Sequence, residues 1–341
     1  MINEMKKIML KDKNKIIKYI EYFGFCHITI KSNYISFARS HDSSPKSIVI
    51  YLKDNENLLV KDFPKNVVKD IFAYISLERC IEYKEVIRVA KNIFGIDNSY
   101  LYKSTVQKPF GGLYSDIKIK EELSYDILDE EVLEEYKNNG NRMFLRDGID
   151  LRTQKYFNIS FSPKDQAICI PIYSPIGDLI GIKGRINKEA DENEQKYFYI
   201  HPCAMSYTLY GYSHNYVYLE SSEIIYVAES EKTVMAAHSY GIRNIVALGS
   251  SSISHKQIEL LLSLRVEKIV LLHDNGFMKK GIIRNAEMIK NFSRMRDIRV
   301  YFWNYFKYEY KGKISPTDLG KEKFLYILKN EIEDIKQIVE R

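Results

Sequence analysis

Residues 224–274 read IIYVAESEKTVMAAHSYGIRNIVALGSSSISHKQIELLLSLRVEKIVLLHD, and this stretch decides the expected fold. It contains three short apolar runs with the length and composition of buried strands. Those strands are expected at 224–228, 245–248 and 268–272. Helical spacing fills the intervals at 231–240 and 254–264, and the second interval opens with a capping-box pattern. Strands that alternate with helices at this spacing predict a parallel sheet with right-handed crossovers.

The patterns on either side of this stretch extend the expectation. Downstream, a third helix is expected at 281–292 and a fourth strand at 299–303. Upstream, residues 167–185 are typical of a β-hairpin, because the turn residues Ser174-Pro-Ile-Gly-Asp178 separate two apolar runs. The fold class is therefore α/β (α+β overall): a parallel βα sheet, a mixed α+β subdomain and a small N-terminal domain.

Two acids stand directly after strands of the expected parallel sheet. Glu229 follows the strand at 224–228, and Asp274 follows the strand at 268–272 after one histidine. Ligands of open parallel sheets bind beyond the carboxyl ends of the strands, so neighbouring strands would bring both carboxylates into one crevice. Mg²⁺ prefers such oxygen ligands, and paired metals support phosphoryl transfer. For one such acid alone, the alternative is an ordinary role: Asp274 would cap the next helix, or Glu229 would simply be solvated. Two acids that follow strands in the same way favour a metal site.

Composition restricts the class of protein and its surroundings. The 341 residues are 45% hydrophobic and 28% charged, with a net charge of +6, which suits a globular chain and permits a polyanionic partner. No apolar run approaches the ~18 residues of a membrane span, and the lysine-rich start lacks a secretory signal. Four scattered cysteines, in no CxxC pair, indicate a reducing, cytoplasmic location without a disulfide framework.

Several short segments occur in an order that is typical of one family. They are Arg146-Asp-Gly-Ile149, the hairpin from Ile170 to Arg185, Lys196-Tyr197 followed by Leu209-Tyr-Gly211, Val227-Ala-Glu229, Leu271 to Gly276, and Ser315-Pro-Thr-Asp318-Leu319. Their order and spacing over residues 142–320 resemble the catalytic core of DnaG-type bacterial and phage DNA primases, which carries a Toprim domain. The resemblance implies that the parallel sheet is of the Toprim type.

The resemblance also implies an enzyme, a DNA primase that makes short RNA primers on single-stranded DNA from nucleoside triphosphates with Mg²⁺ or Mn²⁺. Glu229, Asp274 and Asp318 would then be the metal ligands and catalytic acids, with Glu229 as ligand or as base for the attacking 3′-hydroxyl. A separate replicative helicase is the expected partner. A phage-encoded chain would work in the host cytoplasm.

The same resemblance implies binding roles for several basic and aromatic side chains. The basic residues are Arg146, Lys183, Arg185 and Lys232. The first three would bind template or nucleotide phosphates, and Lys232 would neutralise developing phosphate charge. Ordinary surface positions are the alternative for Arg185 and Lys232. Tyr197 and Tyr210 could stack on bases, with a place in the core as the alternative for at least one of them.

The catalytic segments depart from the family pattern. Glu229-Ser-Glu-Lys-Thr233 lacks a Gly and an Asp of the family's glutamate motif, and Asp274-Asn-Gly276 lacks a second Asp. Fewer carboxylates predict weaker metal binding, or one metal instead of two. Glu231 is a candidate substitute, although its helix position predicts that it faces water. These losses favour a second hypothesis, a weakened primase-like module that binds single-stranded DNA or a helicase without polymerising. A Toprim nuclease or topoisomerase is a third hypothesis, against which residues 139–218 argue.

The N-terminal region is similar to the family's zinc-binding domain, but it lacks most of the residues that bind zinc there. Tyr34 to Ile48 matches the first zinc-binding motif, but only His41 remains there and Ala38 occupies the cysteine position. No cysteine lies near Lys61–Pro64, where the second pair is expected. Because structural zinc almost always has four protein ligands, we predict a zinc-finger-like domain without zinc.

These segments together predict five parts. They are the degenerate N-terminal domain at 1–99, a linker and acidic helix at 100–138, the primase core subdomain at 139–218, the Toprim domain at 219–310 and a C-terminal helical extension at 311–341. The extension is expected to contain one helix at 321–340, with little room for a helicase-docking domain.

Overall fold

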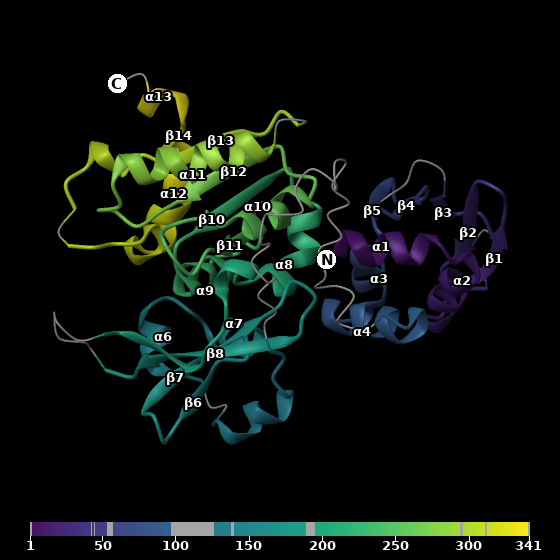
Figure 1. Ribbon diagram of the computed structural model, residues 1–341, viewed down its shortest axis with the longest axis horizontal. Coiled ribbons are helices and arrows are strands. Elements are labelled where there is room, and N and C mark those ends of the chain that lie inside the picture. Colours follow the sequence, from purple (N-terminus) through teal and green to yellow (C-terminus); the bar gives the residue numbers. More distant parts are fainter. Residues whose placement is uncertain are drawn as a thin grey trace, which may run out of the picture. The chain divides into compact units, whose positions relative to one another are not determined.

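The computed structural model describes residues 2–41, 43, 45–52, 57–96, 126–137, 140–188, 195–293, 296–310 and 312–339. The chain forms two compact units, Met1–Asp126 and Ile127–Arg341 (Figure 1). The expected linker and acidic helix fall mostly outside the described residues, and the finer division into five parts remains a prediction. None of the helices in the described parts combines the length and the apolar character that a bilayer crossing requires.

The described residues of the first unit form four helices and one antiparallel sheet. In chain order they are α1 (Ile2–Leu10), α2 (Lys13–Tyr22), β1 (Cys26–Ile30), β2 (Tyr34–Ala38), β3 (Ile48–Tyr51), β4 (Leu59–Asp62), β5 (Val67–Asp70), α3 (Ile71–Arg79) and α4 (Tyr83–Phe94). The strands follow one another across the sheet from β1 to β5. Residues Val67–Asp70 pair antiparallel with β4. Helix α3 begins at Ile71, where the Asp70 carboxylate caps it by accepting from the Ala73 N–H.

The second unit contains an antiparallel sheet that precedes the parallel one. In chain order its described elements are η1 (Glu130–Glu135), α6 (Arg142–Arg146), α7 (Leu151–Tyr156), β6 (Ser160–Ser162), β7 (Ala167–Tyr173), β8 (Leu179–Ile186), β9 (Tyr197–His201), η2 (Met205–Tyr207) and α8 (Tyr212–Glu220). The strands lie in the order β6-β7-β8-β9. The predicted hairpin is confirmed as β7 and β8, and in its turn the Ser174 hydroxyl accepts from the Asp178 N–H at 3.0 Å.

The rest of the second unit is the expected parallel sheet. Its described elements are β10 (Ile224–Ala228), α9 (Glu231–Ser239), β11 (Ile245–Ala247), α10 (His255–Leu262), β12 (Lys268–Leu272), α11 (Lys279–Phe292), β13 (Arg299–Trp303), η3 (Tyr305–Lys307) and η4 (Pro316–Leu319). The strands lie in the order β11-β10-β12-β13, all parallel. The capping box predicted at the start of α10 is present, with the Ser254 hydroxyl and the Gln257 side chain as its two acceptors. The mixed α+β fold class is therefore confirmed.

The strand order places a topological switch between β10 and β12. The chain leaves β10 toward β11 on one side and leaves β12 toward β13 on the other. Right-handed crossovers then put α9 on one face of the sheet and α11 on the opposite face. The two connections diverge at the carboxyl ends of β10 and β12, which leaves a crevice there for ligands.

The C-terminal segment differs from the single helix that we expected. It forms α12 (Lys321–Asn330), then β14 (Ile332–Asp334) and α13 (Lys336–Val339). Strand β14 pairs antiparallel with β13, with Ile332 opposite Trp303 (Figure 1). The exposed edge of β13 supplies hydrogen-bond partners that local helix propensity does not include, so the strand forms where a longer helix was predicted.

Candidate active site

Glu229 and Asp274 lie together at the switch between β10 and β12. Each follows its strand, and pairing of Ala228 with Leu272 sets the two strand ends level. The Lys313 Nζ lies 3.1 Å from Glu229 Oε1 and 3.4 Å from Asp274 Oδ2. The two carboxylate oxygens are therefore no farther apart than the sum of these distances. One ammonium group therefore contacts both acids, and their role as metal ligands stays a prediction.

Glu229 and Asp274 also affect each other electrostatically. Burial raises the pKa of the Asp274 carboxyl, and the neighbouring Glu229 carboxylate raises it further, against the opposing effect of Lys313. Burial alone would lower the pKa of Lys313, but the two carboxylates raise it above its usual value. Among the described residues, Asp274 Oδ1 is buried and has no hydrogen-bond partner. The pair thus offers excess negative charge and one unsatisfied acceptor, both of which a divalent cation would satisfy.

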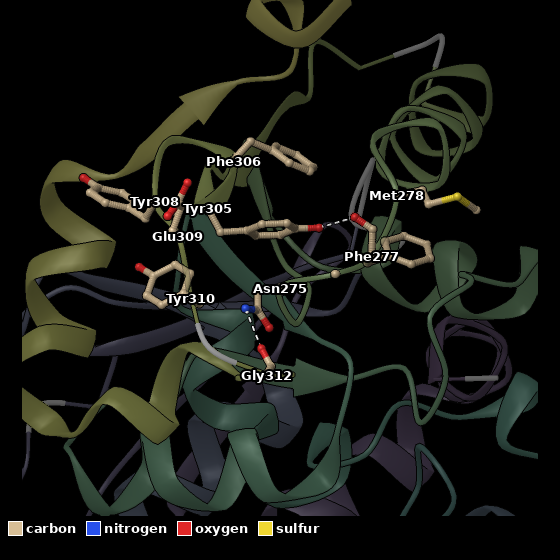
Figure 2. A pocket seen from close by; sticks show the side chains of 10 residues that line it. Asn275, Phe277, Met278, Tyr305, Phe306, Tyr308, Glu309, Tyr310 and Gly312 are labelled. Carbon is tan, nitrogen blue, oxygen red and sulfur yellow. Dashed lines mark hydrogen bonds between the residues drawn. The ribbon is translucent and has the colours of Figure 1, made fainter.

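Asn275 holds the segment that carries Lys313 against the strand end. Its Nδ2 donates to the Gly312 carbonyl at 3.0 Å, as Figure 2 shows, and its Oδ1 accepts from the Ile314 N–H at 2.5 Å. Its own N–H donates to the Ile314 carbonyl at 3.0 Å. Three hydrogen bonds to one short segment therefore fix where the Lys313 side chain begins.

Asp318, the third expected acid, is paired elsewhere. The Lys232 Nζ donates to its Oδ1 at 2.6 Å, and its Oδ2 accepts from the Ser315 N–H at 2.9 Å in a capping box. Burial alone would raise the pKa of Asp318, but Lys232 and Ser315 lower it below its usual value. Its charge still adds to the raised pKa of Asp274. Asp318 is thus close enough to act on the acid pair, although its direct partner is Lys232.

Glu231 and Lys183 form a buried ion pair. The Lys183 Nζ donates to both Glu231 carboxylate oxygens, at 2.8 Å and 3.0 Å, and the Glu231 side chain is only 2% exposed. The expectation that Glu231 faces water is therefore wrong, because β8 of the other sheet brings Lys183 to the first turn of α9. Neither residue points freely at a ligand in this arrangement.

Arg146 and Arg185 line one hollow of about 220 Å³ in the second unit. Arg185 is held by Asp147, with 3.4 Å between Nη2 and Oδ2, and its guanidinium lies 5.5 Å from the centre of the Phe144 ring. Its Nη1 is buried without a hydrogen-bond partner among the described residues. A cationic hollow with an unsatisfied donor is suited to a phosphate oxygen.

The two tyrosines named as stacking candidates differ in accessibility. Tyr210 is buried and its ring stacks on Phe157, so it belongs to the core. The Tyr197 ring lies 5.1 Å from the Lys183 Nζ and is partly accessible. The core alternative therefore holds for Tyr210.

In the first unit, ion pairs connect the two segments that are similar to the zinc-binding motifs of the resembled domain. Arg39 contacts the Asp62 carboxylate and donates from Nε to Glu78 Oε1 at 2.7 Å. Asp62 lies in the Lys61–Pro64 segment, is fully buried and accepts from the Tyr74 hydroxyl at 3.0 Å. This network links β2, β4 and α3, as a bound metal would.

Three side chains of metal-ligand type also meet in the first unit. Cys26, His27 and His41 have ligand atoms within 4.8 Å of one another, and the His27 Nε2 lies 2.9 Å from the His41 carbonyl oxygen. Three are one fewer than a structural zinc site normally has. The absence of zinc therefore stays a prediction.

Comparisons with known proteins place this geometry in context. No protein-family model matches the chain. The DNA primase of Lactococcus lactis is 27% identical over 132 residues, which make up 38% of this chain and 21% of that protein. The chain therefore matches well under two thirds of that relative's length.

Two solved structures share the architecture. The zinc-binding and RNA polymerase domains of the Aquifex aeolicus primase match at a TM-score of 0.50 and 18% identity, covering 98% of this chain and 86% of theirs. The DnaG primase catalytic domain bound to single-stranded DNA matches at 0.51 and 17% identity, covering 61% and 78%. The resemblance seen in the sequence is confirmed, and the fold of this chain is that of the zinc-binding and RNA polymerase domains of DnaG-type primases.

Proposed function

We propose that this chain is a DNA primase that synthesises short RNA primers on single-stranded DNA by metal-dependent nucleotidyl transfer. The observation that carries the proposal is the pair of acids, Glu229 and Asp274, at a switch point of the sheet with one ammonium group between them. The primase fold and the primase relative support the same reaction class.

Glu229 and Asp274 fit a bound Mg²⁺ or Mn²⁺. Both offer carboxylate oxygens, Asp274 Oδ1 has no hydrogen-bond partner among the described residues, and the contacts of Lys313 with both acids support a cation at this point. Such an ion would activate the attacking 3′-oxygen and neutralise charge on the triphosphate.

Protein groups around the pair perform the remaining tasks. Lys313 is 66% exposed, so it can exchange its contacts with the acids for a phosphate oxygen of the nucleotide. Lys232, held by Asp318, is a second cation, and it can neutralise charge on the leaving pyrophosphate. Glu229 accepts the proton of the 3′-hydroxyl or orients that hydroxyl.

The hollow that contains Arg146 and Arg185 is the proposed binding site for template phosphates. Two guanidinium groups on one surface can bind phosphates of a single strand without reading its sequence. A separate replicative helicase remains the proposed partner.

The test is primer synthesis on single-stranded DNA by the wild type and by Glu229→Gln and Asp274→Asn. Glu259→Gln, at an exposed acid of α10, is the matched control. We expect each active-site variant to lose at least about 100-fold in rate, since a general base or metal ligand is removed, while the control keeps its rate. Salt-sensitive DNA binding without any synthesis by the wild type would instead establish the binding module that the losses at Thr233 and Gly276 favour.

A further inference from the structure

Lys313 contacts the acid pair from a segment without regular structure. Residues 312–315 belong to no helix or strand, and the Lys313 side chain is 66% exposed. A long, exposed side chain on such a segment loses rotamer and backbone entropy when it is held in one place. Its Nζ nevertheless lies within 3.4 Å of an oxygen of each acid, Glu229 and Asp274. Another residue must therefore restrict the position of this segment.

Asn275, just beyond β12, provides that restriction. It follows Asp274 directly and is only 8% exposed. Its amide is bonded on both sides of Lys313, because the Nδ2 donates to the Gly312 carbonyl at 3.0 Å, as Figure 2 shows, and the Oδ1 accepts from the Ile314 N–H at 2.5 Å. Within the described parts of the chain, every backbone hydrogen bond of residues 312–314 goes to Asn275. The backbone that carries Lys313 is therefore anchored by this one residue.

The turn directly before Lys313 also has a defined conformation. Gly312 has a φ of +79°, in the left-handed region that residues other than glycine rarely adopt. A Cβ at this position would have open space around it, so the glycine is required by the backbone conformation and not by crowding. The position of Lys313 thus rests on a left-handed turn and on the hydrogen bonds to Asn275.

Asn275 can influence the acids only through Lys313. Both ends of its amide are used by the segment, and among the described residues it forms no hydrogen bond to the side chain of Glu229 or Asp274. Lys313 and Asn275 line the same hollow of about 460 Å³ as Glu229. A phosphate in this hollow can meet the ammonium after a change of side-chain rotamer alone, because the backbone on either side of Lys313 is fixed.

We propose that Asn275 is a positioning residue for nucleotidyl transfer and that it acts through Lys313. It keeps the Lys313 ammonium at the acids while no nucleotide is bound, and within reach of a nucleotide phosphate during the reaction. This inference rests on the proposed function and names a residue that needs to touch neither the metal nor the substrate. A Lys313 without its anchor would neutralise the acids less and would reach the phosphate less often. The affinities for metal and for phosphate should therefore change in opposite directions.

The test measures binding of Mn²⁺, and of inorganic triphosphate at saturating Mn²⁺, by isothermal titration calorimetry. The variants are Asn275→Ala, Lys313→Met and the double variant. Gly312→Val disturbs the same segment at its left-handed turn and leaves the buried amide in place, so it decides the question if Asn275→Ala does not fold. Asn330→Ala is the matched control, because the Asn330 Nδ2 also donates to a backbone carbonyl, that of Tyr326 in α12. Urea unfolding shows which variants remain folded.

We expect Asn275→Ala to tighten Mn²⁺ binding by up to about fivefold and to weaken triphosphate binding roughly three- to tenfold. Gly312→Val should change both affinities in the same directions, and Asn330→Ala should change neither. The double variant should match Lys313→Met, because a residue that acts through Lys313 has no effect once the ammonium is gone. In primer synthesis, the KM of Asn275→Ala for the nucleotide should rise while kcat stays close to that of the wild type.

Three results would overturn the inference and leave the proposed function standing. Weaker Mn²⁺ binding in Asn275→Ala would show that Asn275 supports Asp274 itself. Triphosphate binding that falls in the double variant by the product of the two single effects would show that Asn275 acts independently of Lys313. Unchanged affinities in a folded Asn275→Ala, or in Gly312→Val if the first variant does not fold, would show that Lys313 keeps its place without the anchor. A wild type that makes no primer would overturn the proposed function, and with it any role of Asn275 in the reaction.

Discussion

The Lys313 Nζ lies 3.1 Å from Glu229 Oε1 and also reaches Asp274, so one ammonium group neutralises two acids from separate strands. An ammonium at this point competes with a divalent cation for the same oxygens. The strength of that competition can be measured directly.

Replacing Lys313 by Met should tighten Mn²⁺ binding by up to about fivefold, because an exposed ion pair contributes up to about 1 kcal/mol. Calorimetric or spin-resonance titration with Mn²⁺ measures the change. Lys329→Met, at an exposed lysine of α12, should leave the affinity unaltered. Weaker binding in Lys313→Met would show that the lysine helps to form the site instead of competing for it.

The Lys183–Glu231 pair should act on stability more than on nucleic-acid binding. Glu231 is buried and the Lys183 side chain is only 12% exposed, and loss of one partner of a buried pair leaves an uncompensated charge that costs about 3–5 kcal/mol. We expect this loss in the free energy of unfolding for Lys183→Met and for Glu231→Leu, measured with urea. The double variant should recover much of it. A Lys183→Met protein of full stability with weakened DNA binding would return Lys183 to the phosphate-binding role.

The charge network of the first unit predicts stability without a metal. Asp62 is fully buried and contacts both Arg39 and Tyr74, so Asp62→Leu should cost about 3–5 kcal/mol. Glu85→Gln, which breaks an exposed pair with Arg88, should cost less than about 1 kcal/mol. We also expect a metal chelator to leave the Tm of the wild type unchanged. A chelator-dependent fall in Tm would point to a metal at Cys26, His27 and His41.

Burial of His238 predicts that the folded protein loses stability as the pH falls. It packs against Tyr156, and burial, assisted by Arg243, lowers its pKa from 6.5 to about 4. Between these pH values the unfolded chain binds a proton that the folded chain does not, so the free energy of unfolding decreases as the pH falls. His238→Gln should therefore lose less Tm between pH 7 and about pH 4 than the wild type. The exposed His255→Gln is the control, and equal pH profiles for all three proteins would contradict the assignment.

The sequence predicted the centre of the site because strand ends obey a general rule. Glu229 and Asp274 follow apolar runs, and parallel strands bring their carboxyl ends to one edge. Lys313 and Asn275 could not be assigned in this way. They meet through an irregular segment with no periodic pattern, and the acid missing from Asp274-Asn-Gly276 belongs to the position of Gly276, so the family pattern gives Asn275 no role.

Other differences have the same origin in tertiary contacts. Glu231 was expected to face water because its position in the first turn of a helix is usually solvated, but Lys183 from a different sheet covers it. Strand β14 forms only because β13 offers an edge.

The most direct test of the central claim is a crystal of the protein soaked with Mn²⁺ and measured at a wavelength that locates manganese by its anomalous scattering. The account predicts a peak bonded to oxygens of both Glu229 and Asp274, with Lys313 displaced from them. A crystal without manganese between these two carboxylates, at concentrations that support primer synthesis, would contradict it.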